Sequence, residues 1–263
     1  MNKIKKNIFL GVAALGVFNV ALANGILTKN IQESGFYIGI EGGASMQNGL
    51  EATADYSDLA KKYITGLVTA YPYDGSNNAS YVFGAKVGYF FNSQIAMDLV
   101  YDYHGNYDYY SAAIDDAFQY ISSITDVNSQ TVMLNLNFFP KLNWGNFKPF
   151  ISAGAGMAFN DFGTFNSRYF DLMATDTTPV VDYGINGETK TSFTWQVGAG
   201  ANYFINDNIF LTAGYRFVNL GKFESSDQSP DNILHSVDTQ TPWMVDHVYV
   251  NEFYLGFNYK FEV

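Results

Sequence analysis

The 263-residue chain contains no cysteine, which excludes disulfide bridges, thiolate metal sites and the lipidated cysteine of a bacterial lipoprotein. After residue 23 no apolar run is long enough for a spanning helix, so any membrane crossing must use strands. Basic residues are also scarce. When the three lysines near the N-terminus are left out, the chain contains 11 Lys and Arg and 25 Asp and Glu, which gives a formal charge of −14. We expect no nucleic-acid partner, because phosphates require a basic surface.

The chain is instead rich in aromatic residues (17%) and contains 24 glycines, while charged residues make up only 15%. This composition is unusual for a soluble domain. It is typical of membrane strands, which place Tyr and Phe at the lipid interfaces and Gly where the barrel wall is crowded. The length allows one domain after the N-terminal segment.

The N-terminal segment has the three parts of an export signal. Lys3, Lys5 and Lys6 precede an apolar run over residues 8–20, and Ala21-Leu22-Ala23 follows as a small-residue cleavage site. The run is too short for a membrane anchor. We therefore predict a signal peptide over residues 1–23, cleaved after Ala23, and a single exported domain over 24–263.

The end of the chain, residues 253–263, alternates between a large apolar face and a mostly small or polar face. Such period-two alternation is typical of a strand with two different environments. Eight segments show it, and we predict them as strands: about 35–45, 81–90, 95–106, 130–139, 148–160, 191–204, 209–217 and 247–263. An even number of strands is the rule for bacterial outer-membrane barrels.

The connections between these segments alternate in length. Three are short and contain turn residues: 91–94, 140–146 and 205–208. Four are long: about 46–80, 107–129, 161–190 and 218–246. Short turns on one side and long loops on the other are the plan of an eight-stranded, antiparallel up-and-down barrel with surface loops.

The two faces of the strands show which side of the wall meets lipid. One face collects large apolar residues such as Ile38, Phe83 and Leu134, while the other collects Gly, Ser, Asn and charged residues. A lipocalin-like soluble barrel needs an apolar interior, which the second face cannot provide. We therefore expect the apolar face to meet lipid and the polar face to line the lumen.

The inward face predicts a cluster of opposite charges. An eight-stranded barrel is just wide enough for side chains to fill, and buried charges must be paired or hydrated. We interpret the cluster as a structural plug of salt bridges that largely fills the lumen, and the alternative is an ion path through a wet gap. The predicted lumen network consists of Glu41, Lys86, Asp98, Asp102, Arg216 and Lys260.

Catalytic and metal-binding signals are weak. The histidines His104, His235 and His247 have no metal-ligand spacing, and we expect no metal, cofactor or catalytic residue. A lipid-modifying enzyme would need His104 beside a serine and an acid at the lipid-facing rim. A histidine near the outer end of a strand is more simply interpreted as a solvated polar residue.

The long loops contain tyrosine and tryptophan residues among many acidic residues. Tyr and Trp are frequent anchors of protein contacts, although they also pack loops together or sit at the lipid interface. Our loop contact candidates are Tyr63, Tyr71, Tyr109 and Trp243. The acidity of the loops favours a partner with a basic patch.

Three strand motifs resemble a known family. Residues 148–156 (KPFISAGAG), 214–221 (GYRFVNLG) and 132–137 (VMLNLN) are similar to strands of small surface-antigen and opacity-type porins, which are also similar to the membrane domain of OmpA-type proteins. The resemblance implies an eight-stranded outer-membrane barrel with four variable loops, in a family that includes adhesins. Members usually end in an aromatic residue, whereas this chain ends in Val263. The peptidoglycan-binding domain of OmpA-type proteins is not expected.

Together these observations predict an integral protein of the cell outer membrane that acts through its loops in adhesion and envelope integrity. The alternatives are a narrow pore for ions or small solutes and, less favoured, the lipid-modifying enzyme. The expected partners are outer-membrane lipid and lipopolysaccharide, the barrel assembly machinery, and a host or environmental surface ligand. The expected state is a monomer.

Overall fold

The computed structural model describes residues 34–47, 69–70, 79–114, 118–142, 144–171, 181–185, 187–226, 228–230, 237–239 and 244–261. The predicted signal peptide and the contact candidates Tyr63, Tyr71 and Trp243 lie outside the described residues. Within them, no helix is sufficiently long and apolar to span a membrane.

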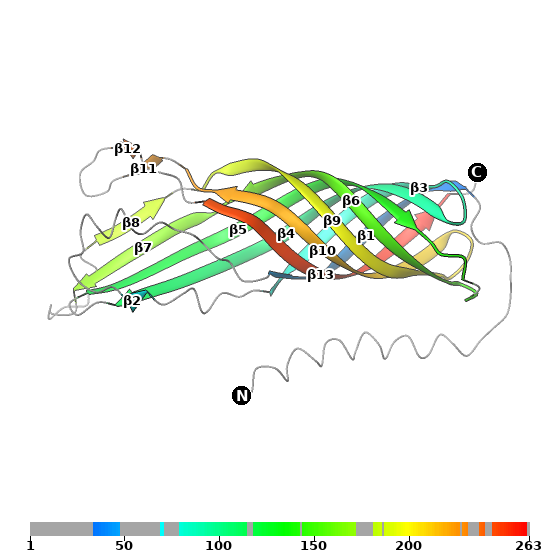
Figure 1. Ribbon diagram of the computed structural model, residues 1–263, viewed down its shortest axis with the longest axis horizontal. Helices are drawn as coiled ribbons and strands as arrows, with labels where there is room; N and C mark the ends of the chain where they lie inside the picture. Colours follow the sequence, from blue (N-terminus) through cyan, green and yellow to red (C-terminus); the bar gives the residue numbers. More distant parts are fainter. Residues whose placement is uncertain are drawn as a thin grey trace, which may run out of the picture.

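Eight long strands form a closed antiparallel barrel (Figure 1), which confirms the predicted fold class. They follow one another around the wall in the order β4-β3-β1-β13-β10-β9-β6-β5, and pairing of β4 with β5 closes the ring. Their bounds are β1 Gly35–Gln47, β3 Ala79–Phe90, β4 Ile95–Ile114, β5 Phe118–Phe138, β6 Phe147–Asp161, β9 Thr189–Phe204, β10 Ile209–Glu224 and β13 Met244–Lys260.

Asparagine side chains shape two of the three short turns. Asn92 Oδ1 accepts hydrogen bonds from the backbone N–H groups of Gln94 and Ile95, at 2.8 and 3.0 Å. In the same way, Asn206 Oδ1 accepts hydrogen bonds from the backbone N–H groups of Asn208 and Ile209, at 2.9 and 2.7 Å. An Asn side chain that bonds the backbone two residues on imitates a backbone turn, which explains why these hairpins are tight.

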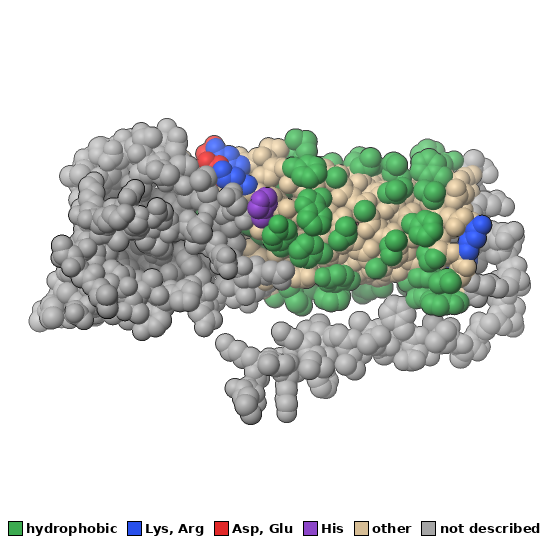
Figure 2. Space-filling view, viewed as in Figure 1, with side chains coloured by type: hydrophobic (Ala, Val, Ile, Leu, Met, Phe, Trp, Pro, Cys, Tyr) green, Lys and Arg blue, Asp and Glu red, His purple; other side chains and the backbone are tan. Residues whose placement is uncertain are grey.

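The outer surface of the barrel is apolar, as the alternation predicts. Phe36, Ile38 and Ile40 are exposed by 58%, 48% and 55%, whereas the intervening Tyr37 is buried. On the face shown in Figure 2, hydrophobic side chains cover the length of the barrel and charged side chains gather at its two ends. This distribution suits a wall that crosses a hydrocarbon layer.

All four predicted loops contain paired strands, which corrects the sequence-based boundaries. Within 107–129, β4 continues to Ile114 and β5 begins at Phe118, so this connection is a long hairpin. Within 161–190, β7 (Thr164–Asp171) pairs with β5 and then with β8 (Val181–Ile185). A short β2 (Thr69–Ala70) adds to the end of β4. The resulting sheet, which we call the extension, projects beyond the barrel (Figure 1).

The sequence pattern did not reveal the strands of the extension, and the reason is physical. Beyond the lipid neither face of a sheet meets hydrocarbon, so the alternation of apolar and polar residues that marks the barrel strands is lost. The fourth predicted loop, 218–246, likewise contains the end of β10 and the small hairpin of β11 (Gln228–Pro230) and β12 (Val237–Thr239).

Candidate functional site

The barrel interior is layered, which corrects the expectation of a lumen lined by small and polar residues. Two apolar clusters are buried inside, one toward the short turns and one toward the long connections. The first, which we call the aromatic layer, contains Tyr37, Phe90, Ala96, Phe139, Phe150, Phe204 and Phe210. The second, the outer apolar layer, contains Tyr107, Val127, Met133, Phe162, Val218, Leu220, Phe223, Val248 and Val250.

Polar and charged side chains fill the space between these layers. Strand β10 shows the order: Phe210 belongs to the aromatic layer, Arg216 is buried among carboxylates, and Val218 and Leu220 belong to the outer apolar layer. We call the middle part the charged layer, and its ionisable members among the described residues are Glu41, Lys86, Asp98, Asp102, His104, Arg216 and Glu252.

Arg216 is the centre of the charged layer. Its Nε lies 2.6 Å from Glu252 Oε2, and its Nη1 lies 2.7 Å from Glu41 Oε1 and 3.0 Å from Asp102 Oδ2. Lys86 Nζ is 2.9 Å from the other oxygen of Glu41. These side chains are less than 10% exposed, so the ion pairs are shielded from water and each charge depends on its partners.

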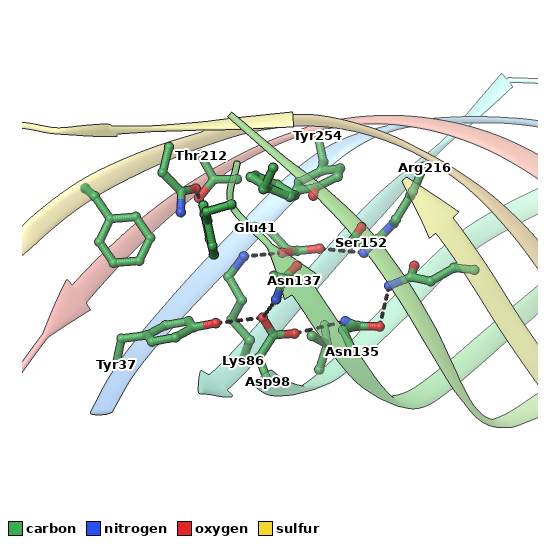
Figure 3. Close-up of a pocket in the computed structure, with 16 residues that line it drawn as sticks. Tyr37, Glu41, Lys86, Asp98, Asn135, Asn137, Ser152, Thr212, Arg216 and Tyr254 are labelled. Carbon is green, nitrogen blue, oxygen red and sulfur yellow. Dashed lines mark hydrogen bonds and ion pairs between the residues drawn. The ribbon is translucent and has the colours of Figure 1, made fainter. Parts of the chain in front are cut away.

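A second network surrounds Asp98 and uses neutral donors. Tyr37 Oη donates to Asp98 Oδ2 at 2.7 Å, and the amides of Asn137 and Asn135 donate at 2.7 and 3.0 Å. Gln196 Nε2 in turn donates to Asn135 Oδ1 at 2.6 Å. This network lies beside the Lys86–Glu41–Arg216 pairs in Figure 3.

Glycine on the facing strand makes room for these inward side chains. Gly84 of β3 is the register partner of Asp102, and a Cβ at Gly84 would lie 2.0 Å from Asp102 Oδ1. A side chain at this position would force the carboxylate away from Arg216, so the glycine is a requirement of the ion pair.

His104 is completely buried, which corrects the interpretation of a solvated residue near the rim. Its Nδ1 lies 2.7 Å from Glu252 Oε1 and its Nε2 lies 3.2 Å from Thr131 Oγ1. Ser45 donates to the same Glu252 oxygen at 2.8 Å and contacts Tyr107 Oη at 2.7 Å. The histidine, hydroxyl and acid thus lie inside the barrel, next to Tyr107 of the outer apolar layer.

Sequence reasoning missed Glu252 and the apolar layers. Glu252 shares the inward parity of Lys260, which is a signal that could have identified it. The phenylalanines of the aromatic layer stand at strand ends beside the short turns, where the predicted strands stopped. Lys260 is buried at that end, opposite Tyr37 in the register. Tyr109 pairs with Ile124 in the extension.

Comparisons with known proteins agree with this architecture. The sequence profile of the family described as Outer membrane protein beta-barrel domain matches residues 10–261. Outer membrane protein PagN of Salmonella typhimurium is 29% identical over 148 residues, which are 54% of each chain, so the chain spans about half the length of that relative.

Solved structures of similar proteins are more distant. Neisserial surface protein A shows 13% identity and a TM-score of 0.41, with 87% of this chain and 99% of that chain covered. Ail of Yersinia pestis, in complex with the heparin analogue sucrose octasulfate, shows 14% identity and a TM-score of 0.37, with 88% and 99% covered.

Proposed function

Because the chain belongs to the outer membrane protein β-barrel family, we propose that it is a surface-interaction protein whose closed barrel displays a binding surface outside the membrane. The protein is located in the cell outer membrane, with the apolar wall of its barrel in contact with lipid. The observation that carries the proposal is the pair of apolar layers that enclose the charged layer.

The layered interior supports a barrel that does not conduct ions. An ion that enters from either side must leave its hydration shell to pass buried apolar side chains before it reaches any charged group. In the aromatic layer, Phe90, Phe204 and Phe210 pack with ring centroids 4.9 to 6.5 Å apart. The ion pairs of the charged layer then hold the wall together, and the charges serve structure better than transport.

The extension provides a surface that reaches away from the membrane. Tyr101 of β4 is 44% exposed, and its Oη donates to Gln130 Oε1 of β5 at 2.8 Å, a polar contact suited to the outer interface. From Tyr103 to Ile114, β4 continues for about 35 Å at the usual rise of a strand. A paired sheet of this length displays a defined surface to a partner beyond the lipid.

Electrostatics indicate the kind of partner. The four long connections, 46–80, 107–129, 161–190 and 218–246, contain 18 acidic and 5 basic residues, which is −13 of the −14 charge of the chain without residues 1–23. Charge concentrated at one end of the barrel attracts cationic surfaces and repels polyanions. The proposed ligand is therefore a macromolecule with a basic patch on a host or environmental surface.

Neither rival function gains support from the geometry. A pore would need a wet path past Glu41, Lys86 and Arg216, and the apolar layers lie on both sides of them. An enzyme would need access to His104, which is completely buried. The proposal therefore includes no catalytic activity.

The refolded chain in a planar bilayer should show no steady single-channel conductance, because two apolar layers block the lumen. A heat-dependent gel shift on the same sample confirms that the barrel is folded. Reproducible conductance steps that change selectivity when Lys86→Met or Arg216→Met is introduced would contradict the closed lumen and favour the narrow pore.

Shortening the extension should abolish surface binding and leave the barrel folded. Residues 110–123 are replaced by Asn-Gly, a tight hairpin turn, because Tyr109 and Ile124 already face one another in the register. Bacteria that display the full chain should adhere to epithelial cells more strongly than bacteria with the shortened variant, and adhesion should weaken as salt screens the acidic surface. Equal adhesion by both variants at every salt concentration would contradict the proposal.

A further inference from the structure

The charged layer contains a small cavity of about 30 Å³. Glu41, Lys86 and Arg216 line one side of it, and Asp98 and Asn135 line the other (Figure 3). A cavity of this volume has room for one or two water-sized groups, provided that polar atoms around it can bind them.

Two residues that line this cavity each have a buried polar atom without a hydrogen-bond partner in the described part of the chain. One atom is a donor, Nη2 of Arg216, and the other is an acceptor, Oε1 of Gln196. The two residues are 3% and 4% exposed. An unpaired buried polar atom is costly, and most such atoms in native proteins bind ordered water or another ligand.

The hydrogen bonds around Asp98 fix the orientation of the Gln196 amide. Asn135 Nδ2 donates to Asp98 Oδ1 at 3.0 Å, so Asn135 Oδ1 is the atom that faces Gln196. Gln196 therefore presents its Nε2 to Asn135, at 2.6 Å, and Oε1 remains as an acceptor. If the amide were rotated, two oxygens that can only accept would face each other. The unpaired oxygen is thus a consequence of the network.

Strand pairing brings the donor and the acceptor to the same part of the cavity. Arg216 of β10 pairs with Gly198 of β9, and Gln196 is the next inward residue of β9. Gly198 also pairs with Ser152 of β6. A Cβ at Gly198 would lie 3.0 Å from Ser152 Oγ and 3.1 Å from Arg216 Cβ. The glycine therefore leaves space between the Ser152 hydroxyl and Arg216, beside Gln196.

The side chains that line the cavity oppose an ion of either sign. Lys86 and Arg216 repel a cation, and the Glu41 carboxylate, which is paired with both, repels an anion. An occupant that satisfies both unpaired atoms must accept a hydrogen bond from Arg216 and donate one to Gln196. Water is the smallest neutral molecule that does both, and it fits the volume.

We propose that this cavity binds a structural water molecule that accepts a hydrogen bond from Arg216 Nη2 and donates one to Gln196 Oε1. The Ser152 hydroxyl, which also lines the cavity, is a further partner. The water joins the ion pairs around Arg216 to the amide network around Asp98, so the charged layer becomes one connected unit. The site is independent of the extension and of the proposed surface function.

Crystals of the refolded barrel, at a resolution that shows ordered water, should contain a peak about 2.7–3.2 Å from both Arg216 Nη2 and Gln196 Oε1. The peak should be lost in Gln196→Met and kept in Gln130→Met, which makes the same change at an exposed residue. A cavity without density in the wild type, or a peak bound only by carboxylate oxygens, would overturn the proposal. If Gln196→Met does not fold, the wild-type density alone decides.

Solid-state NMR of the barrel in lipid vesicles supplies an independent test. Magnetisation that starts on water should reach the Arg216 guanidinium in the wild type and in Gln130→Met, and this transfer should be lost in Gln196→Met. The spectra also report whether each variant is folded. Absence of transfer to Arg216 in the wild type would show that its Nη2 binds no water, which contradicts the proposed site.

Discussion

Arg216→Met should destabilise the barrel by about 3–5 kcal/mol, the usual cost of leaving buried charges without their partner. Arg216 contacts three carboxylates and is only 3% exposed. Without Arg216, Asp102 has no ion-pair partner, and its oxygens form no hydrogen bond in the described structure. Glu41 then keeps only its ion pair with Lys86. Urea unfolding in detergent or lipid vesicles measures the change in the free energy of unfolding.

Lys222→Met is the matched control. Lys222 Nζ lies 3.1 Å from Glu224, but its side chain is 40% exposed, so its loss should change stability by less than about 1 kcal/mol. The double variant Arg216→Met with Asp102→Asn should be less destabilised than the sum of the single variants, because it removes the carboxylate that Arg216→Met leaves without a partner. A loss for Arg216→Met as small as that for Lys222→Met would show that the network is compensated in another way.

The barrel itself could be predicted from the sequence because lipid and lumen impose different demands on alternate residues. Phe36, Ile38 and Ile40 face lipid while Tyr37, Gly39 and Glu41 face inward, and this parity survives along the whole strand. Asn92 and Asn206 mark the tight turns with their own side chains. Local sequence patterns are sufficient for such features, since each depends only on neighbours along the chain.

The pairing of the lumen charges could not be predicted in this way. Arg216 and Glu41 are 175 residues apart, and they meet because of the stagger between β10, β13 and β1 around the barrel. No short pattern specifies that stagger. The parity correctly placed five charged residues inside the barrel: Glu41, Lys86, Asp98, Asp102 and Arg216. It could not show that Arg216 forms ion pairs with three carboxylates, or that Asp98 forms no ion pair within the described part of the chain.

The position of the apolar layers was missed because parity describes the direction of a side chain and not its depth. Phe90, Phe204 and Phe210 point inward at strand ends, where the turn signals dominate the local sequence. The barrel interior therefore resembles a soluble core at each end and a salt-bridge cluster in the middle. This arrangement buries the charges more completely than a uniformly polar lumen would.

Phe210→Ala should destabilise the barrel by about 3–5 kcal/mol, because it leaves a cavity in a packed aromatic cluster. Phe210 is 2% exposed and packs on Phe204, Tyr37 and Phe90 at centroid distances of 4.9, 5.7 and 5.9 Å. Phe257→Ala is the matched control. Phe257 is 49% exposed on the outer wall of the neighbouring strand, where lipid chains fill the space that the ring leaves, so its loss should be clearly smaller.

Conductance of the Phe210→Ala barrel separates stability from sealing. The closed lumen that we propose does not depend on this ring alone, because Val218, Leu220 and Val250 of the outer apolar layer stay completely buried, so the variant should show no conductance in a planar bilayer. Steady conductance after loss of this one ring would show that the aromatic layer alone closes the barrel. A silent but destabilised barrel is the result expected when both layers contribute to the seal and each is also part of the core on which the fold depends.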